Sequence, residues 1–179
     1  MNVKFSAKCV AVIAAGAMSM SLAAGSGGSM GGSGSSDGSA ANADTITLGS
    51  ITTNSGTAAA YGEAEVAGFK LAVDEINAKG GINGKKVKLE SMDDKGDATE
   101  ASNAFNKLAG DASVLGVLGP TISSTTAAVA PLADQAKLPA ISPAATSDSI
   151  ETGGYMFRTC FKESYQGEIA AKFAAETLK

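Results

Sequence analysis

The stretch Val114–Thr146 reads VLGVLGP, TISSTTAAVAPLADQAK and LPAISPAAT, and it decides the fold class. Its apolar run Val114–Leu118 is short and ends at Gly119-Pro120, which predicts a buried strand. The hydroxyl residues from Ser123 to Thr126 then favour the start of a helix. A second short strand is predicted at Leu138–Ile141. Two neighbouring strands would therefore end in loops that are rich in small and hydroxyl residues.

These strand ends are the predicted functional region. In an open α/β sheet, ligands bind outside the carboxyl ends of the strands. A helix that begins there offers free N–H groups and the positive end of its dipole, which suit a carboxylate. The sequence therefore predicts a lobe that binds a small molecule.

The rest of the chain alternates strands and helices. This spacing predicts an α/β fold with a doubly wound parallel sheet and right-handed crossovers. One helix carries an apolar stripe of Val66, Phe69, Val73 and Ile76, and the next faces inward with Ala101, Ala104, Phe105 and Leu108. The helix after Ser123 is expected to bury Val129, Leu132, Ala133 and Ala136. The further predicted strands are Thr45–Ile51, Lys85–Met92 and Tyr155–Thr159, and the further helices are Tyr61–Lys79, Ala98–Ala109 and Glu163–Leu178.

Composition excludes several classes of function. The net charge is −4 and the basic residues are scattered, which argues against a nucleic-acid partner. The chain has no His, so it has no Ser-His-Asp or Cys-His nucleophile system. No cofactor or metal is predicted, and Asp93 and Asp94 are expected to form a solvated loop. Cys160 is expected to be a small buried side chain rather than a reactive thiol.

The N-terminal region predicts export. Lys4 and Lys8 precede the apolar run Val10–Ala24, which is shorter than the ~20 apolar residues of a membrane span, so residues 1–24 are predicted to be a signal peptide. An uncleaved anchor is the alternative. Gly25 stands where a lipoprotein has its lipid-bearing Cys, so a lipid anchor is not supported. Residues 25–43 form a Gly/Ser-rich linker, and residues 44–179 form the ligand-binding domain.

Several motifs in a fixed order give the chain its resemblance to a known family. They include Ser55-Gly56, Tyr61-Gly62, the run from Asp74 to Gly84, Asp93-Asp94, Gly119-Pro120 with Ser123-Ser124, the run from Ser142 to Thr146, Phe157-Arg158-Thr159 and Gln166-Gly167. Together they resemble the branched-chain amino-acid (leucine, isoleucine, valine) substrate-binding proteins of bacterial ABC transporters, which have the type I periplasmic binding fold. Each motif is weak alone, and the ordered set is specific.

The resemblance implies two flavodoxin-like or Rossmann-like lobes with the ligand between them. Only the first lobe is matched, and the chain ends within a predicted helix, so we expect a fragment without the second lobe. Members bind an amino acid or a similar small zwitterion, such as an amide, and deliver it to a membrane permease without chemistry. The implied location is periplasmic or otherwise extracytoplasmic.

The resemblance also implies the site residues. Ser123 and Ser124 match positions that hold the ligand carboxylate, and Ala144 matches one whose carbonyl accepts from the ammonium. Ala145 belongs to the same loop, Thr146 matches a position that touches the zwitterion, and Tyr61 matches an aromatic that closes over the ligand. Each assignment has a purely structural alternative. The serines could simply cap a helix, the loop from Ala144 to Thr146 could be an ordinary turn, and Tyr61 could be a surface aromatic.

One departure from the family concerns a disulfide. Some members have one between positions that Gly96 and Ile122 occupy here, so that link is missing.

Two other functions stay open. The first is an enzyme on the same sheet, with Ser123 or Thr146 as nucleophile. The second is a sensor domain that signals to a membrane partner.

Overall fold

The computed structural model describes residues 45–150 and 154–178. The chain divides into two units, Met1–Asp37 and Gly38–Lys179, and all described residues belong to the second unit. The predicted signal peptide and the Gly/Ser-rich linker lie outside the described residues. Both remain predictions.

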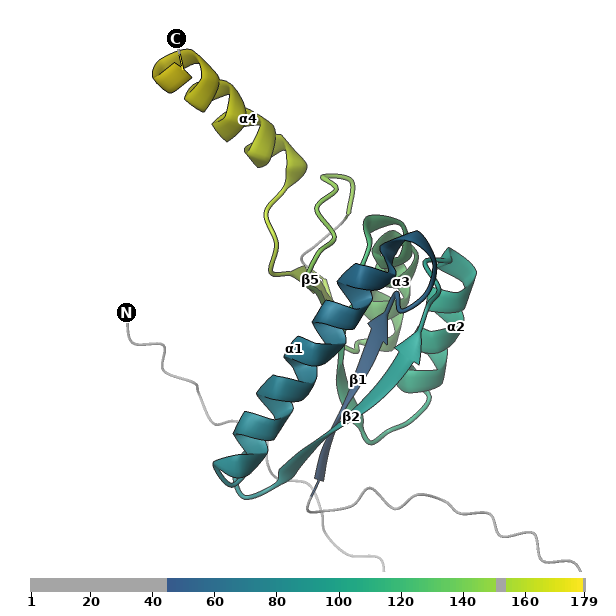
Figure 1. Cartoon of the computed structure of the whole chain (residues 1–179). Coiled ribbons are helices and arrows are strands. Elements are labelled where there is room, and N and C mark those ends of the chain that lie inside the picture. Colours follow the sequence, from purple (N-terminus) through teal and green to yellow (C-terminus); the bar gives the residue numbers. More distant parts are fainter. Residues whose placement is uncertain (1–44, 151–153, 179) are drawn as a thin grey trace, which may run out of the picture. The chain divides into compact units, whose positions relative to one another are not determined.

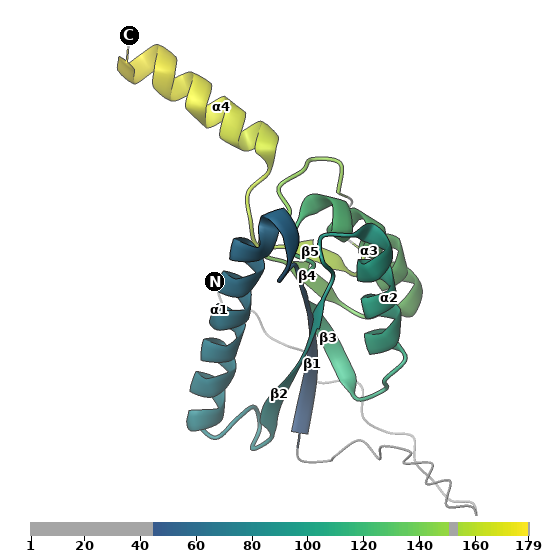
Figure 2. The same cartoon turned by 45° about the vertical axis from the view of Figure 1, so that its right-hand side comes forward.

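Five parallel strands of the described chain form one sheet in the order β2-β1-β3-β4-β5 (Figure 1 and, with all five strands labelled, Figure 2). This order is the flavodoxin-like one, so the predicted α/β class and the parallel sheet are confirmed. Because the chain moves from β1 outward to β2 and then back across to β3, the switch point of the sheet lies between β1 and β3. The strands are β1 (Thr45–Thr52), β2 (Lys86–Asp93), β3 (Val114–Leu118), β4 (Ala140–Ser142) and β5 (Met156–Arg158).

Helices cover both faces of this sheet (Figure 2). The helix α1 (Ala59–Ala78) follows a short 3-10 turn, η1 (Gly56–Ala58), and packs on one face against β1 and β2. The helices α2 (Ala98–Ala109) and α3 (Ser123–Ala136) pack together on the other face. The crossovers of a doubly wound sheet require this division, since the chain reverses direction at the switch point.

The core lies between the sheet and the α2–α3 face. Phe105 and Leu108 of α2 are buried there with Ile51 and Val129. Gly49 allows this contact, since a Cβ on it would come within 2.6 Å of the Leu108 side chain. The predicted inward face of α2 is therefore confirmed.

Two predicted apolar faces differ from the structure. Ala136, in the last turn of α3, is exposed, whereas Ala130, which was not predicted to face inward, is buried. The stripe of α1 is only half-buried, because α1 lies on the face that α2 and α3 do not cover. Periodicity predicted which side of α1 faces the sheet but could not predict how deeply it is covered.

The last helix stands apart from the core. The sequence predicts one helix at Glu163–Leu178, and the structure has α4 (Glu163–Phe173) followed by a π-helical turn, η2 (Ala174–Leu178). Its apolar side chains Ile169, Phe173 and Leu178 are exposed, so no described residue covers them. No helix in the described part of the chain is long and apolar enough to cross a membrane.

Candidate functional site

A hollow of about 490 Å³ opens at the carboxyl edge of the sheet. Segments that follow four different strands, β1, β3, β4 and β5, contribute to its wall. Its volume is within the range of small-molecule pockets. The wall consists of Thr57, Ala58, Tyr61, Ile122, Ser123, Pro143, Ala144, Thr146, Cys160 and Phe161.

The first turn of α3 provides the polar end of this hollow. The N-cap residue is Ile122, in extended conformation, and no side chain caps the helix. The first backbone N–H groups therefore keep their hydrogen-bonding capacity, and the helix dipole adds positive potential. No charged side chain is among the residues that line the hollow. The helix end is thus the electropositive feature of an otherwise apolar and hydroxyl-rich wall.

The structure brings four of the six predicted site residues together. Tyr61, Ser123, Ala144 and Thr146 all line the hollow, and Tyr61 is 65% exposed. Ser124 is exposed and does not belong to the wall, because it follows Ser123 around the helix. Ala145 is fully buried, and its N–H donates to the Ser142 hydroxyl. Neither of these two residues reaches the hollow with its side chain.

Arg158, at the end of β5, holds the loop after β4 in place. Its Nη1 donates to the carbonyl oxygens of Ala145 (3.1 Å) and Ser147 (2.8 Å). Its Nη2 donates to the carbonyl of Ile150 at 2.9 Å. One planar guanidinium thus fixes the curvature of the loop that carries Ala144 and Thr146. The sequence motif contained this arginine, but nothing in its spacing indicated its partners.

Two further contacts join this loop to neighbouring elements. The N–H of Ser147 donates to the Ser123 hydroxyl at 3.2 Å, which links the loop to the start of α3. The Ser164 N–H and hydroxyl donate to the two carboxylate oxygens of Asp148, at 2.9 and 2.7 Å. Asp148 therefore caps α4 from outside the helix, and these hydrogen bonds lower the pKa of its carboxyl group.

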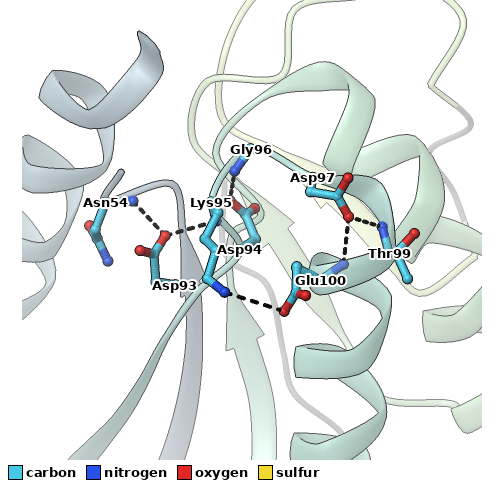
Figure 3. Close-up of polar contacts among 8 residues, drawn as sticks. All are labelled: Asn54, Asp93, Asp94, Lys95, Gly96, Asp97, Thr99 and Glu100. Carbon is cyan, nitrogen blue, oxygen red and sulfur yellow. Dashed lines mark hydrogen bonds and ion pairs between the residues drawn. The ribbon is translucent and has the colours of Figure 1, made fainter. Parts of the chain in front are cut away.

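The loop after β2 is not the solvated loop that the sequence predicts. Asp94 is fully buried, and its Oδ1 accepts from the Thr53 hydroxyl (2.6 Å) and from Gly96 N–H (2.9 Å). Asp93 accepts through Oδ1 from the N–H groups of Asn54 (2.9 Å) and Lys95 (2.8 Å), as Figure 3 shows. Partial burial acts to raise the pKa of Asp93, but these backbone hydrogen bonds lower it overall. The two carboxylates thus tie the ends of β1 and β2 together.

Asp97 completes the same loop as the N-cap of α2 (Figure 3). Its Oδ1 accepts from Glu100 N–H at 2.9 Å and Thr99 N–H at 2.8 Å. Both hydrogen bonds lower the pKa of Asp97. Within the described residues, no group of three or more His, Cys, Asp or Glu side chains could hold a metal ion.

Sequence reasoning missed part of the hollow. Cys160 was expected to be buried but is partly exposed in the wall, next to Phe161. Thr57, Ala58 and Pro143 were assigned only to loops. A Cβ on Gly96 would lie 3.7 Å from Cδ1 of Ile122, so the two positions that the family resemblance associates with a disulfide are neighbours here.

Comparison with known proteins identifies the family. The family described as periplasmic binding protein matches residues 45–179, which is most of the chain. The chain belongs to the periplasmic binding protein family. The resemblance that the sequence motifs indicate is therefore confirmed.

Individual relatives of this periplasmic binding protein agree with that assignment. A Leu/Ile/Val-binding protein, BraC3, from Rhizobium johnstonii is 38% identical over 141 residues, which is 78% of this chain and 38% of the relative. The Leu/Ile/Val-binding protein of Escherichia coli K12 is 36% identical over 76% of this chain and 38% of its own. The chain thus spans well under half the length of the curated relatives it matches.

A solved structure shows the same fold. The branched-chain amino acid transporter substrate-binding protein LivJ from Streptococcus pneumoniae, in complex with isoleucine, matches with a TM-score of 0.70. It is 42% identical, and the match covers 75% of this chain and 39% of that one.

Proposed function

We propose that the chain is the first lobe of an extracytoplasmic solute-binding component of an ABC transporter. Its ligand is a branched-chain or other small amino acid, or a related amide, bound between this lobe and a second one. The protein delivers the ligand to a membrane permease, uses no cofactor and catalyses no reaction. The similarity to proteins named for leucine, isoleucine and valine binding supports this choice of ligand class.

One observation carries the proposal. The uncapped first turn of α3 ends at an apolar hollow that has no charged side chain in its wall. Free N–H groups at the positive end of a helix dipole bind a carboxylate. The apolar part of the wall suits an aliphatic side chain, because its burial removes apolar surface from water.

The ligand is seated by atoms of three segments. The N–H groups at the start of α3 and the Ser123 hydroxyl bind the carboxylate. The Ala144 carbonyl accepts from the ammonium, and Thr146 contacts the zwitterion. Tyr61, which is mostly exposed, closes over the ligand. Ser124 and Ala145 support the two segments from outside the hollow.

Transport follows from closure of two lobes. A ligand that contacts both lobes favours the closed form by its difference in affinity for the two states. Residues 1–24 act as the export signal and residues 25–43 as the linker, which place the lobe outside the cytoplasm. The exposed apolar side of α4 and η2 would be available to the proposed second lobe.

Calorimetry on the complete two-lobed protein tests the proposal. We expect saturable binding of leucine, isoleucine or valine, and no binding of isopentylamine, which lacks the carboxylate. The isolated chain should bind leucine much more weakly, since the other lobe supplies part of the contact. Absence of heat and of a thermal shift with amino acids, amides and urea would contradict the proposal.

Two alternatives make different predictions. An enzyme that uses Ser123 would turn over an ester or amide and lose that activity in Ser123→Ala. In the structure, the hydroxyl of Ser123 accepts from a backbone N–H, and no Lys or carboxylate among the described residues is bonded to it. A sensor domain would bind the same ligand, but a signalling segment would follow the ligand-binding lobes.

A further inference from the structure

A continuous chain of hydrogen-bonded polar groups lies beside the hollow, and its member Glu65 lines an adjoining hollow together with Tyr61, Pro143 and Ala144. The hydroxyl of Thr121 donates to Oε2 of Glu65 at 2.6 Å and accepts from the Thr53 N–H at 3.0 Å. The Thr53 hydroxyl in turn donates to Asp94 Oδ1 at 2.6 Å. Thr53, Thr121 and Asp94 are all buried, and Glu65 is half-buried. The chain therefore connects α1 to the segments that follow β1, β2 and β3.

The direction of these hydrogen bonds makes Glu65 indispensable to the chain. A threonine hydroxyl has one hydrogen, and because the carboxylate oxygen of Glu65 can only accept, that hydrogen points to Glu65 while the hydroxyl oxygen accepts from Thr53 N–H. If Glu65 lost its acceptor oxygen, the buried Thr121 hydroxyl would be an unsatisfied donor. The backbone around Thr121 would have to move to recover a partner.

That backbone forms part of the hollow. Thr121 directly precedes Ile122, the N-cap of α3, and Ser123, its first residue, and both line the hollow. On the other side, Gly119 has a φ of +111°, and a Cβ there would collide with the carbonyl of Ile51. The segment is thus held tightly on both sides. Its position decides where the free N–H groups of α3 point.

Burial of the Glu65 carboxylate costs free energy of folding, which indicates that this residue does more than fill space. Burial raises the pKa of Glu65, the Thr121 hydrogen bond lowers it, and the negative charge of Asp94 raises it further. No Lys or Arg is among the groups that shift it. Oε1 of Glu65 and Oδ2 of Asp94 are buried without a hydrogen-bond partner among the described residues. A helix position on α1 would be more stable with an apolar residue if Glu65 only filled space.

We propose that Glu65 is a positioning residue for ligand binding: through the Thr121 hydroxyl, it fixes the backbone that presents Ile122 and Ser123 to the ligand. Glu65 acts as a hydrogen-bond acceptor at a fixed reach, and its negative charge is not needed. This inference rests on the proposed function, because its consequence is a change in ligand affinity.

Two conservative substitutions separate the effect of the side-chain length at position 65 from the effect of its negative charge. Glu65→Gln keeps an acceptor oxygen at the same distance and removes the charge. Glu65→Asp keeps the charge but shortens the side chain, so the 2.6 Å contact with Thr121 is lost. Glu63→Gln is the matched control, since Glu63 is exposed on the same helix.

The experiment measures leucine affinity by calorimetry on the complete protein, with the amide hydrogen exchange of Thr53 on the same variants. We expect Glu65→Asp to bind leucine about tenfold more weakly and to lose protection at the Thr53 amide. Glu65→Gln should stay within about threefold of the parent and keep that protection. Glu63→Gln should change neither quantity.

The outcomes separate this inference from the proposed function. The reverse order, with Glu65→Gln weaker than Glu65→Asp, would overturn the role of a neutral acceptor. Equal affinity and equal Thr53 protection in all variants would overturn the positioning role altogether. If the parent protein itself binds no amino acid, the proposed function fails. The inference fails with it for ligand binding, while Thr53 exchange still decides whether Glu65 holds the segment.

Discussion

Thr146 and Glu163 form a reciprocal pair of hydrogen bonds. The Thr146 hydroxyl donates to Oε1 of Glu163 at 2.9 Å, and the Glu163 N–H donates to the Thr146 carbonyl at 3.1 Å. Thr146 lines the hollow and Glu163 is the first residue of α4. The pair therefore joins the wall of the hollow to the last helix.

Replacement of Thr146 by Val should affect both ends of this pair. The substitution removes the hydroxyl and keeps the side-chain volume. We expect leucine affinity in the complete protein to fall about tenfold and amide exchange at the start of α4 to accelerate. Calorimetry and hydrogen exchange measure the two effects. Thr146→Ser is the control that should restore both, and parental affinity in the Val variant would refute a ligand contact of this hydroxyl.

Ser123 allows its hydroxyl and its N–H to be tested separately. Ser123→Ala removes only the hydroxyl, whereas Ser123→Pro also removes the N–H. Proline is tolerated at the first helical position, and Ile122 before it has φ −100° and ψ 159°, a conformation that proline accepts. We expect Pro to weaken leucine binding about tenfold more than Ala, because the lost N–H would bind a charged carboxylate.

Calorimetry on the two Ser123 variants decides this comparison, with far-UV circular dichroism as the check that α3 still forms. Equal affinities of the Ala and Pro variants would mean that the Ser123 N–H does not bind the carboxylate. The proposed seat of the ligand would then be wrong at this atom.

Arg158 should contribute to stability as well as to the shape of the hollow. Replacement by Met leaves three carbonyl groups without their donor, which should cost about 2–3 kcal/mol of unfolding free energy. Urea denaturation of the full chain measures this loss. Arg158→Lys is the informative control, since a lysine keeps the charge but cannot reproduce the planar geometry. Full recovery by Lys would show that the charge alone matters.

Glu65 gives the fold a pH dependence of predictable sign. Burial and the charge of Asp94 hold its pKa above the ordinary value of 4.5, although the Thr121 hydrogen bond opposes them. The folded state therefore binds this proton more tightly than the unfolded chain. Its stabilising contribution is complete below about pH 4.5 and is lost as the pH rises through the raised pKa.

Glu65→Gln should remove this contribution to the pH profile. The variant should be more stable than the parent at neutral pH, and its melting temperature should fall less between pH 4.5 and 7. Differential scanning calorimetry across this range measures both. The Glu63→Gln control should follow the parent, and a Gln variant that is less stable than the parent at pH 7 would contradict the assignment.

Asp97 should give the stability of the fold a pH dependence of the opposite sign to that of Glu65. The N–H groups of Glu100 and Thr99 hold its pKa below 3.8, so its contribution to stability is present above that pH and is lost as the pH falls through the lowered pKa. Asp97→Ala should lower the melting temperature at neutral pH and reduce the loss of stability in acid. Asp97→Asn keeps the cap without the titration. Identical melting curves of the parent and the Ala variant would rule out a stabilising cap.

Much of the architecture could be predicted because local patterns carry it. The strand Val114–Leu118 and the helix Ala98–Ala109 have the predicted bounds, since apolar runs and glycine stops are local signals. The exposed α4 could not be predicted, because an apolar stripe marks a face to be covered but not its partner. Asp94 was assigned to a solvated loop for a similar reason, since its partner Thr53 is distant in sequence.

The sequence by itself determined the alternation of strands and helices, the family, and the helix start at Ser123 beside a strand end. All of these depend on the order and spacing of neighbouring residues. Only the tertiary structure decided that Tyr61, Ser123, Ala144 and Thr146 share one hollow while Ala145 is sealed in the core. It alone also connected Glu65 to Thr121 and Arg158 to the loop after β4. The physical reason is that hydrogen bonds between distant segments depend on how the strands are ordered across the sheet, and no local pattern records that order.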